Sequence, residues 1–164
     1  MSDLLVPLLK LPPLEPHTSR LGAMGILVRR ARPYEKSHVL RFVRAHFSEG
    51  WSDEADTSFA HVPVGCFVAT HGEKVIGFAA IEATAPNFFG PMGVDPAHRL
   101  KGIGTALTIA ALLGLRDLGY VYGIIGSAGP VAFYERTVQA TIIEGSEPGL
   151  YSDMLAAARE EPQR

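Results

Sequence analysis

Apolar residues in the middle of this chain gather into short runs that glycine and charged residues separate. The runs at 66–70 and 74–81 are rich in Val, Ile and Phe, and they flank the turn His-Gly-Glu at 71–73, which predicts a β-hairpin. A shorter run at 26–30 predicts a strand that precedes this hairpin. We therefore expect a sheet that begins with antiparallel strands.

Two further apolar runs predict strands that a long helix connects. The run 87–94 contains Gly90-Pro91, and because proline cannot donate to a ladder we expect an edge, a bulge or a splay there. The run 120–125 has no polar alternation, which predicts a strand that is buried on both faces and parallel to its neighbour. The residues between these strands predict an apolar helix from the loop at 102 to about Leu118, covered on most sides.

The remaining pattern predicts helices on either side of these strands. Apolar residues recur at helical spacing from 33 to 47, and we expect Gly50 to end that helix. A short second helix is expected from Trp51, with Ser52 as its cap, and another at 131–136.

The end of the chain looks like a closing antiparallel pair of strands, Ala140 to Ile143 and Gly149 to Leu155. Together the elements predict an α/β domain with a mixed, mostly antiparallel twisted sheet of about six to seven strands and helices on both faces. The crossover between the two parallel strands should leave a cleft at their carboxyl ends.

The length of 164 residues predicts one domain. We expect residues 1–24, which proline punctuates, to be an extended leader that packs on the domain surface through its leucines. A disordered tail is the alternative. Residues 25–158 are expected to form the single domain and 159–164 a polar, solvated tail.

Composition narrows the function classes. Lys and Arg number 15 against 17 Asp and Glu, a formal charge of −2, which argues against general nucleic-acid binding. The single cysteine excludes an internal disulfide framework, and the six histidines show no H-x-x-x-H pair, so no metal motif is present. The longest apolar run is shorter than the roughly 20 residues of a membrane helix, and the start of the chain lacks a signal-peptide pattern. We therefore expect a cytoplasmic protein without membrane, nucleic-acid or metal partners.

A basic loop with two glycines precedes the long helix. Gly102 and Gly104 let the backbone come close to a ligand, and the helix start offers unpaired N–H groups and the positive end of its dipole. Arg99 and Lys101 flank that start, so we expect an anion site for phosphates, with an ordinary helix start as the alternative. The P-loop pattern is absent, and a dinucleotide fingerprint would need a third glycine.

The loop pattern R-x-x-G-x-G from Arg99 to Gly104, after a strand that ends in V-x-P, resembles the acetyl-CoA signature of the GCN5-related N-acetyltransferases. The segment 125–136 resembles the same family's next strand, turn and tyrosine-bearing helix, and the order of elements agrees over most of the chain. This chain departs from the family at Leu100, where glycine is frequent, and at Ser127, where asparagine is frequent.

The resemblance implies transfer of an acetyl group from acetyl-CoA, as co-substrate, directly to the amine of a small molecule or a peptide. It implies that Tyr134 is the general acid for the CoA sulfur, with a core aromatic role beside Phe133 as the alternative. The residues expected to bind CoA lie on the splayed strand, the loop and the tyrosine helix: Met92, Gly93, Val94, Arg99, Leu100, Lys101, Gly102, Ile103, Gly104, Thr105, Ser127, Phe133 and Arg136.

A general base must accept the proton of the amine. Glu82, at the end of its strand beside the expected cleft, is the first candidate, and Glu54 on the short second helix is the next. Trp51 and Asp53 are expected to line the acceptor groove, where the acids could instead attract a cationic acceptor without taking its proton. A CoA or acyl-CoA sensor without turnover and a transferase of longer acyl groups are the alternatives, and a homodimer is compatible with the apolar helix.

Overall fold

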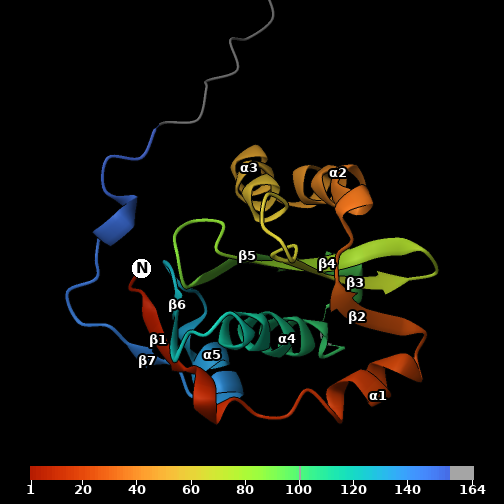
Figure 1. Ribbon diagram of the computed structural model, residues 1–164, viewed down its shortest axis with the longest axis horizontal. Coiled ribbons are helices and arrows are strands. Elements are labelled where there is room, and N and C mark those ends of the chain that lie inside the picture. Colours follow the sequence, from red (N-terminus) through yellow and green to blue (C-terminus); the bar gives the residue numbers. More distant parts are fainter. Residues whose placement is uncertain (100, 156–164) are drawn as a thin grey trace, which may run out of the picture.

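The computed structural model describes residues 1–99 and 101–155, and in these ranges a seven-stranded sheet forms the centre of the molecule (Figure 1). Its strand order is β2-β3-β4-β5-β6-β1-β7, and the β5–β6 pair is parallel whereas the other neighbours are antiparallel. The predicted mixed, mostly antiparallel sheet is thereby confirmed. The strands are β1 Leu4–Pro7, β2 Ile26–Arg30, β3 Cys66–His71, β4 Lys74–Ile81, β5 Phe88–Val94, β6 Tyr122–Ile125 and β7 Thr141–Ile142.

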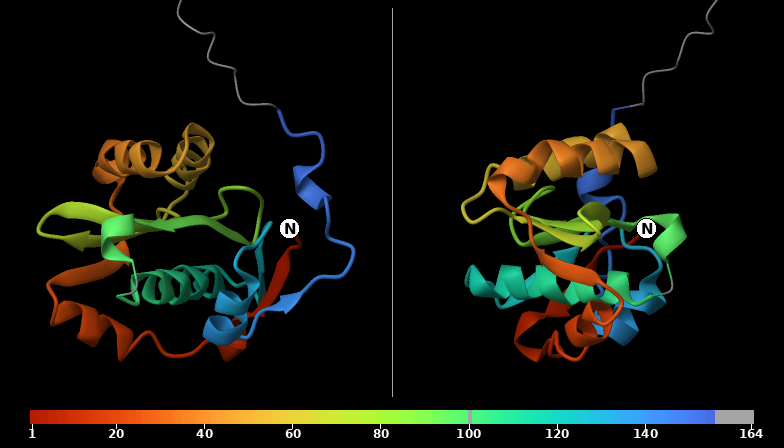
Figure 2. Two further views of the ribbon diagram at one scale, coloured as in Figure 1. Left: turned by 180° about the vertical axis from the view of Figure 1, so that it is seen from behind. Right: turned by 90° about the vertical axis from the view of Figure 1, so that its right-hand side faces the viewer.

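Helices cover both faces of the sheet, with α2 and α3 on one face and α1, α4 and α5 on the other (Figures 1 and 2). The helices are α1 His17–Gly22, α2 Lys36–His46, α3 Glu49–Ser58, α4 Ile103–Asp117 and α5 Val131–Val138. Short 3₁₀ turns occur as well, among them η2 at Pro33–Glu35, which leads into α2, and η4 at Gly149–Tyr151.

The central strands are apolar on both faces because two separate cores lie above and below the sheet. In β3, Phe67 and Ala69 pack into the core that contains α4, while Cys66 and Val68 pack into the core beneath α2 and α3. This alternation follows from the two-residue period of a strand. The apolar runs of the hairpin are uninterrupted because each face of its strands packs against one of the two cores.

Strands β5 and β6 pair only at their start. The register joins Phe88 to Ile124 and Phe89 to Ile125, and it ends there, immediately before Gly90. β5 continues to Val94 beside β4, whereas the chain after Ile125 leaves the sheet as a loop that leads into α5. The predicted interruption at Gly90-Pro91 therefore coincides with the point at which the two parallel strands separate.

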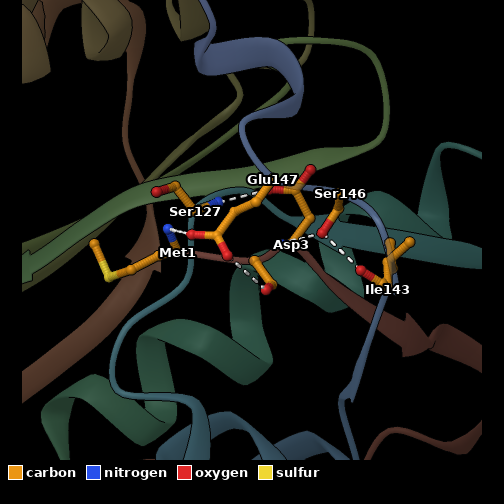
Figure 3. Close-up of polar contacts among 7 residues, drawn as sticks. Met1, Asp3, Ser127, Ile143, Ser146 and Glu147 are labelled. Atoms are coloured by element: carbon orange, nitrogen blue, oxygen red, sulfur yellow. Dashed lines mark hydrogen bonds and ion pairs between the residues drawn. The ribbon is translucent and has the colours of Figure 1, made fainter.

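The expectation of a leader on the surface is wrong for β1. This strand lies between β6 and β7, and its side chains Leu4 and Val6 are fully buried. Polar groups fix its start: the Asp3 N–H donates to Ser146 Oγ at 2.8 Å, and Asp3 Oδ1 accepts from the Ser127 N–H at 2.7 Å (Figure 3). The segment packs inside the sheet because its alternating apolar residues fill the place between two strands from the far end of the chain.

Three smaller expectations are also wrong, on the cap of the second helix, on the burial of β6 and on the closing strand pair. The cap of α3 is Ser48, whose Oγ accepts from the Trp51 N–H at 3.1 Å, since α2 already ends at His46 and Ser52 lies buried within α3. Strand β6 is not buried on both faces, because Tyr122 is 52% exposed.

The closing strand pair does not form either. β7 pairs with β1 instead, and the residues after 148 form η4.

Two expectations, on Leu100 and on the tail 159–164, lie outside the described residues. In the ranges 1–99 and 101–155, no helix has both the length and the apolar character needed to cross a membrane.

Candidate active site

A cavity of about 590 Å³ opens where β5 and β6 separate. It lies between the end of β5, the start of α4, the loop before α5 and the aromatic residues at the α2–α3 junction. The residues that line it are Phe47, Trp51, Met92, Gly93, Val94, His98, Arg99, Gly102, Ile103, Gly104, Thr105, Gly129, Pro130, Phe133 and Tyr134. Nine of the residues predicted to bind CoA are thus brought together with Tyr134 around one space.

The start of α4 forms the polar end of this cavity. Gly102 is the N-cap with a φ of 77°, a left-handed conformation that favours glycine, and its carbonyl accepts from the Ala106 N–H. The N–H groups of the first helical turn have no intrahelical acceptor and carry the positive end of the helix dipole. At Gly104 an added Cβ would find its nearest neighbours, Phe133 and Val94, at 3.9 Å. The first turn is therefore open to a ligand anion.

The free edge of β5 forms one wall. Residues 92–94 pair with β4 on one side, and β6 has already left the other side at Phe89. Backbone groups on that side have no strand partner within the described ranges, so they can bind an extended ligand as a neighbouring strand would. The Phe47 ring packs directly over Gly93, where a side chain would collide with it. The wall is thus narrow and backbone-lined.

Tyr134 lies at the base of the cavity on α5. Its ring packs edge-on against Phe133 and Phe89, with centroid distances of 5.0 and 6.1 Å, and the residue is only 6% exposed. Burial raises the pKa of the Tyr134 hydroxyl to about 12, so the phenol stays protonated at neutral pH. The packing therefore holds a neutral O–H donor at a cavity wall.

Aromatic residues from the other face of the sheet close the cavity opposite Tyr134. Phe47 and Trp51 stack with ring centroids 5.3 Å apart, and Trp51 remains 37% exposed. Glu54 follows Trp51 by one turn of α3, and its Oε1 accepts from Thr84 Oγ1 at 2.8 Å. Asp53 is exposed and does not line the cavity. The structure thus brings Trp51 to the cavity, places Glu54 one helical turn away, and leaves Asp53 outside.

The carboxylate of Glu82 lies away from the cavity. It accepts hydrogen bonds from the Tyr120 hydroxyl and from the Asn87 N–H, and the first of these raises the pKa of Tyr120. The Glu82 N–H donates to the carbonyl of Phe88, at the start of β5. Because β4 and β5 are antiparallel, the end of β4 lies beside the start of β5, whereas the cavity extends along the end of β5.

Three other predicted residues do not line the cavity. Lys101 and Arg136 are exposed, and Ser127 turns its N–H toward Asp3. Four lining residues had not been predicted: Phe47, His98, Gly129 and Pro130. His98 directly precedes the predicted loop and its Nδ1 lies 3.2 Å from Asp95 Oδ2, so only the loop boundary was drawn too narrowly.

This chain is similar to known acetyltransferases. A family model described as an acetyltransferase (GNAT) domain matches residues 63–137, which include β3 to α4 and Tyr134. Mycothiol acetyltransferases of Rhodococcus erythropolis and Thermobispora bispora are 32% and 33% identical over 115 and 95 residues. These alignments cover 58% and 53% of this chain, but the chain spans only 38% and 29% of the two relatives.

Solved structures share the fold. The glucosamine N-acetyltransferase region of a fungal multi-domain β-N-acetylglucosaminidase superposes with a TM-score of 0.68 at 18% identity, covering 87% of this chain and 19% of that chain. A GNAT family acetyltransferase of Brucella melitensis, solved in complex with acetyl-CoA, gives 0.54 at 22% identity and covers 72% of this chain and 86% of its own. The matched domain and the shared fold make this chain similar to GCN5-related N-acetyltransferases.

Proposed function

We propose that this domain transfers an acetyl group from acetyl-CoA to an amine. The observation that carries the proposal is the cavity itself, which joins an open helix start, a free strand edge and the buried phenol of Tyr134 in a chain that matches an acetyltransferase domain over residues 63–137. Acetyl-CoA offers a chemical match to each part: phosphates for the helix start, an amide-containing arm for the strand edge and a sulfur for the phenol.

The CoA phosphates would bind at the first turn of α4. The N–H groups of residues 103–105 would donate to the anion, and Arg99, which also lines the cavity, would add a positive charge. The pantetheine arm would run along the free edge of β5 at Met92 to Val94, and a backbone N–H there could polarise the thioester carbonyl. This arrangement directs the thioester toward the point where β5 and β6 separate.

In the reaction, the neutral amine attacks the thioester carbonyl carbon, a carbon–nitrogen bond forms, and the carbon–sulfur bond then breaks. The Tyr134 hydroxyl donates to the departing sulfur, and any proton that it gives up is replaced by the proton that leaves the amine nitrogen. The net result is an amide, a free thiol and an unchanged tyrosine. Holding both substrates in one cavity supplies much of the rate through orientation.

The acceptor would approach from the α3 side of the cavity. Trp51 offers an aromatic face there, and Glu54 supplies negative charge one helical turn away. An alkylammonium is attracted by both groups. Glu54 would therefore bind the acceptor or take its proton, whereas Glu82 has its carboxylate engaged outside the cavity.

The test is thiol release from acetyl-CoA with a panel of amines, comparing the wild type with Tyr134→Phe. We expect Tyr134→Phe to lower kcat by about 100-fold or more, as for the loss of a placed acid, while the Kd for acetyl-CoA stays within about twofold. If the wild type binds acetyl-CoA but releases no thiol above background with any amine, the domain is a CoA-binding module and the proposed transfer is wrong.

A further inference from the structure

The guanidinium of Arg20 lies against the glycine loop although its helix, α1, is far away in the sequence. Arg20 Nη1 donates to the Lys101 carbonyl at 3.0 Å. A Cβ added to Gly102 would collide with this guanidinium, so the two groups are in direct contact. Gly102 lines the cavity and Arg20 does not, so Arg20 reaches the proposed donor site through its contact with Gly102.

The packing of α1 against the core holds Arg20 at the loop. Leu21, the next residue of α1, is fully buried in the core that also contains α4. The helix is therefore docked beneath the sheet at the end where α4 begins, as Figures 1 and 2 show for its place below α4. Docking of Leu21 brings Arg20 to the loop.

The charge of Arg20 has no acidic partner within residues 1–99 and 101–155. Glu15, the acid that precedes α1, accepts hydrogen bonds from the hydroxyls of Thr18 and Ser19. A guanidinium has five N–H donors, and the carbonyl of Lys101 occupies one nitrogen of Arg20. Donors and a full positive charge therefore remain beside the open helix start.

We propose that Arg20 binds a phosphate group of CoA, as an additional cation that the glycine-loop pattern does not contain. This inference rests on the proposed function, because it takes CoA as the ligand of the cavity. The planar guanidinium can make paired hydrogen bonds to a phosphate, and the Lys101 carbonyl holds it in place before the ligand arrives. Gly102 is then required for a second reason besides its positive φ: its missing side chain leaves the space that the guanidinium fills.

The experiment measures CoA binding by isothermal titration calorimetry in Arg20→Gln, Arg20→Lys and a control, Arg44→Ala. Glutamine can still donate to the Lys101 carbonyl but has no charge, and lysine keeps the charge. Arg44 is an exposed arginine on α2, on the opposite face of the sheet. We expect about tenfold weaker CoA binding for Arg20→Gln, about threefold for Arg20→Lys and no change for Arg44→Ala, as for loss of one charge-assisted hydrogen bond at an exposed site.

Two further ligands identify the contact. Dephospho-CoA lacks the 3′-phosphate, so a loss that persists with this ligand assigns Arg20 to the diphosphate, and a loss that disappears assigns it to the 3′-phosphate. Acetyl-pantetheine has no phosphate group, so its turnover should be the same in Arg20→Gln as in the wild type. Thermal unfolding of each variant checks that α1 remains docked.

The outcomes separate this inference from the proposed function. Wild-type affinity in Arg20→Gln would overturn the inference and leave the donor site intact. A parallel fall with CoA and acetyl-pantetheine in both Arg20 variants would show that Arg20 only holds the loop in shape, which also overturns it. If the wild-type protein itself binds no CoA, the proposed function fails and the inference with it.

Discussion

The proposed donor and acceptor sides of the cavity are built in different ways. The donor side is one nearly continuous stretch, from Met92 on β5 to Thr105 on α4, and it offers backbone groups and a helix start. The proposed acceptor side depends on side chains: Trp51 of α3 lines the cavity, and Glu54 of α3, which is hydrogen-bonded to Thr84 of the β4–β5 loop, lies beyond its lining. Backbone geometry depends little on which side chains are present, whereas a wall of side chains can change one residue at a time. We therefore expect donor binding and acceptor choice to be separable by mutation.

The largest effect is expected on the donor side, from Gly104→Glu. The added side chain would enter the open first turn of α4 and bring a negative charge to the place proposed for the phosphates. We expect CoA binding to weaken by about 100-fold or more, because the loss of two charge-assisted hydrogen bonds at roughly 1.5 kcal/mol each corresponds to that factor.

Gly104→Ala is the matched control, since the nearest atoms to its added methyl group are 3.9 Å away. Its Kd for CoA, measured by calorimetry, should stay within about threefold of the wild type. Equal affinities in Gly104→Glu and the wild type would mean that the phosphates do not bind at α4.

On the acceptor side, Glu54→Gln is expected to raise the KM for cationic amines by about tenfold, the order of one charge-assisted interaction. Affinity for acetyl-CoA should not change, because Glu54 does not line the donor stretch. Steady-state kinetics with a charged amine and a neutral aromatic amine would show whether the effect follows the acceptor's charge.

Glu82→Gln provides the comparison for that variant. Glutamine can still accept from the Tyr120 hydroxyl, and the carboxylate it replaces lies outside the cavity. We expect rates within about twofold of the wild type. A large loss of kcat in Glu82→Gln, with Glu54→Gln unaffected, would reverse the proposed assignment of the two acids.

A smaller effect than that of Glu54→Gln is expected from Trp51→Ala. Trp51→Ala removes one aromatic face but leaves its stacking partner Phe47 over Gly93. We expect the acceptor KM to rise about threefold to tenfold and Trp51→Phe to recover most of it, since a stacked aromatic contact is worth roughly 0.5–1.5 kcal/mol. If Trp51→Ala weakens acetyl-CoA binding more than acceptor binding, Trp51 belongs to the donor side.

The contrast between the two sides of the cavity also explains which features of the site could be predicted from the sequence. The place of the glycine loop and the helix start was predictable because its signals are local: glycine spacing, flanking Arg and Lys residues and a helix start follow one another in the chain. An edge, a bulge or a splay at Gly90-Pro91 could also be predicted because these residues interrupt an apolar run, and β5 and β6 do separate there. Tyr134 was predicted from the resemblance of the segment 125–136 to the acetyltransferase family, and its role as an acid stays a prediction.

What could not be predicted depends on register and on distant pairing. Glu82 was expected near the cavity because it ends a strand, but only the antiparallel register shows that this end lies beside the start of β5. The leader was expected on the surface because nothing within residues 1–24 indicates which strands would receive β1. Arg20 was overlooked for the same reason, since its contact with the loop exists only after α1 has docked.

The position of β1 in the sheet affects the order in which the protein folds during synthesis. Strands β2 to β5 pair with their neighbours in sequence, so this part of the sheet can assemble as the ribosome delivers it. Leu4 must wait for Ile125 and Ile142, which emerge much later. Until then the apolar residues of β1 have no partner strand, and unpaired apolar strands are prone to aggregation or chaperone binding. The β6-β1-β7 end of the sheet, which holds the loop next to the cavity through Asp3, is therefore expected to be the last part to fold.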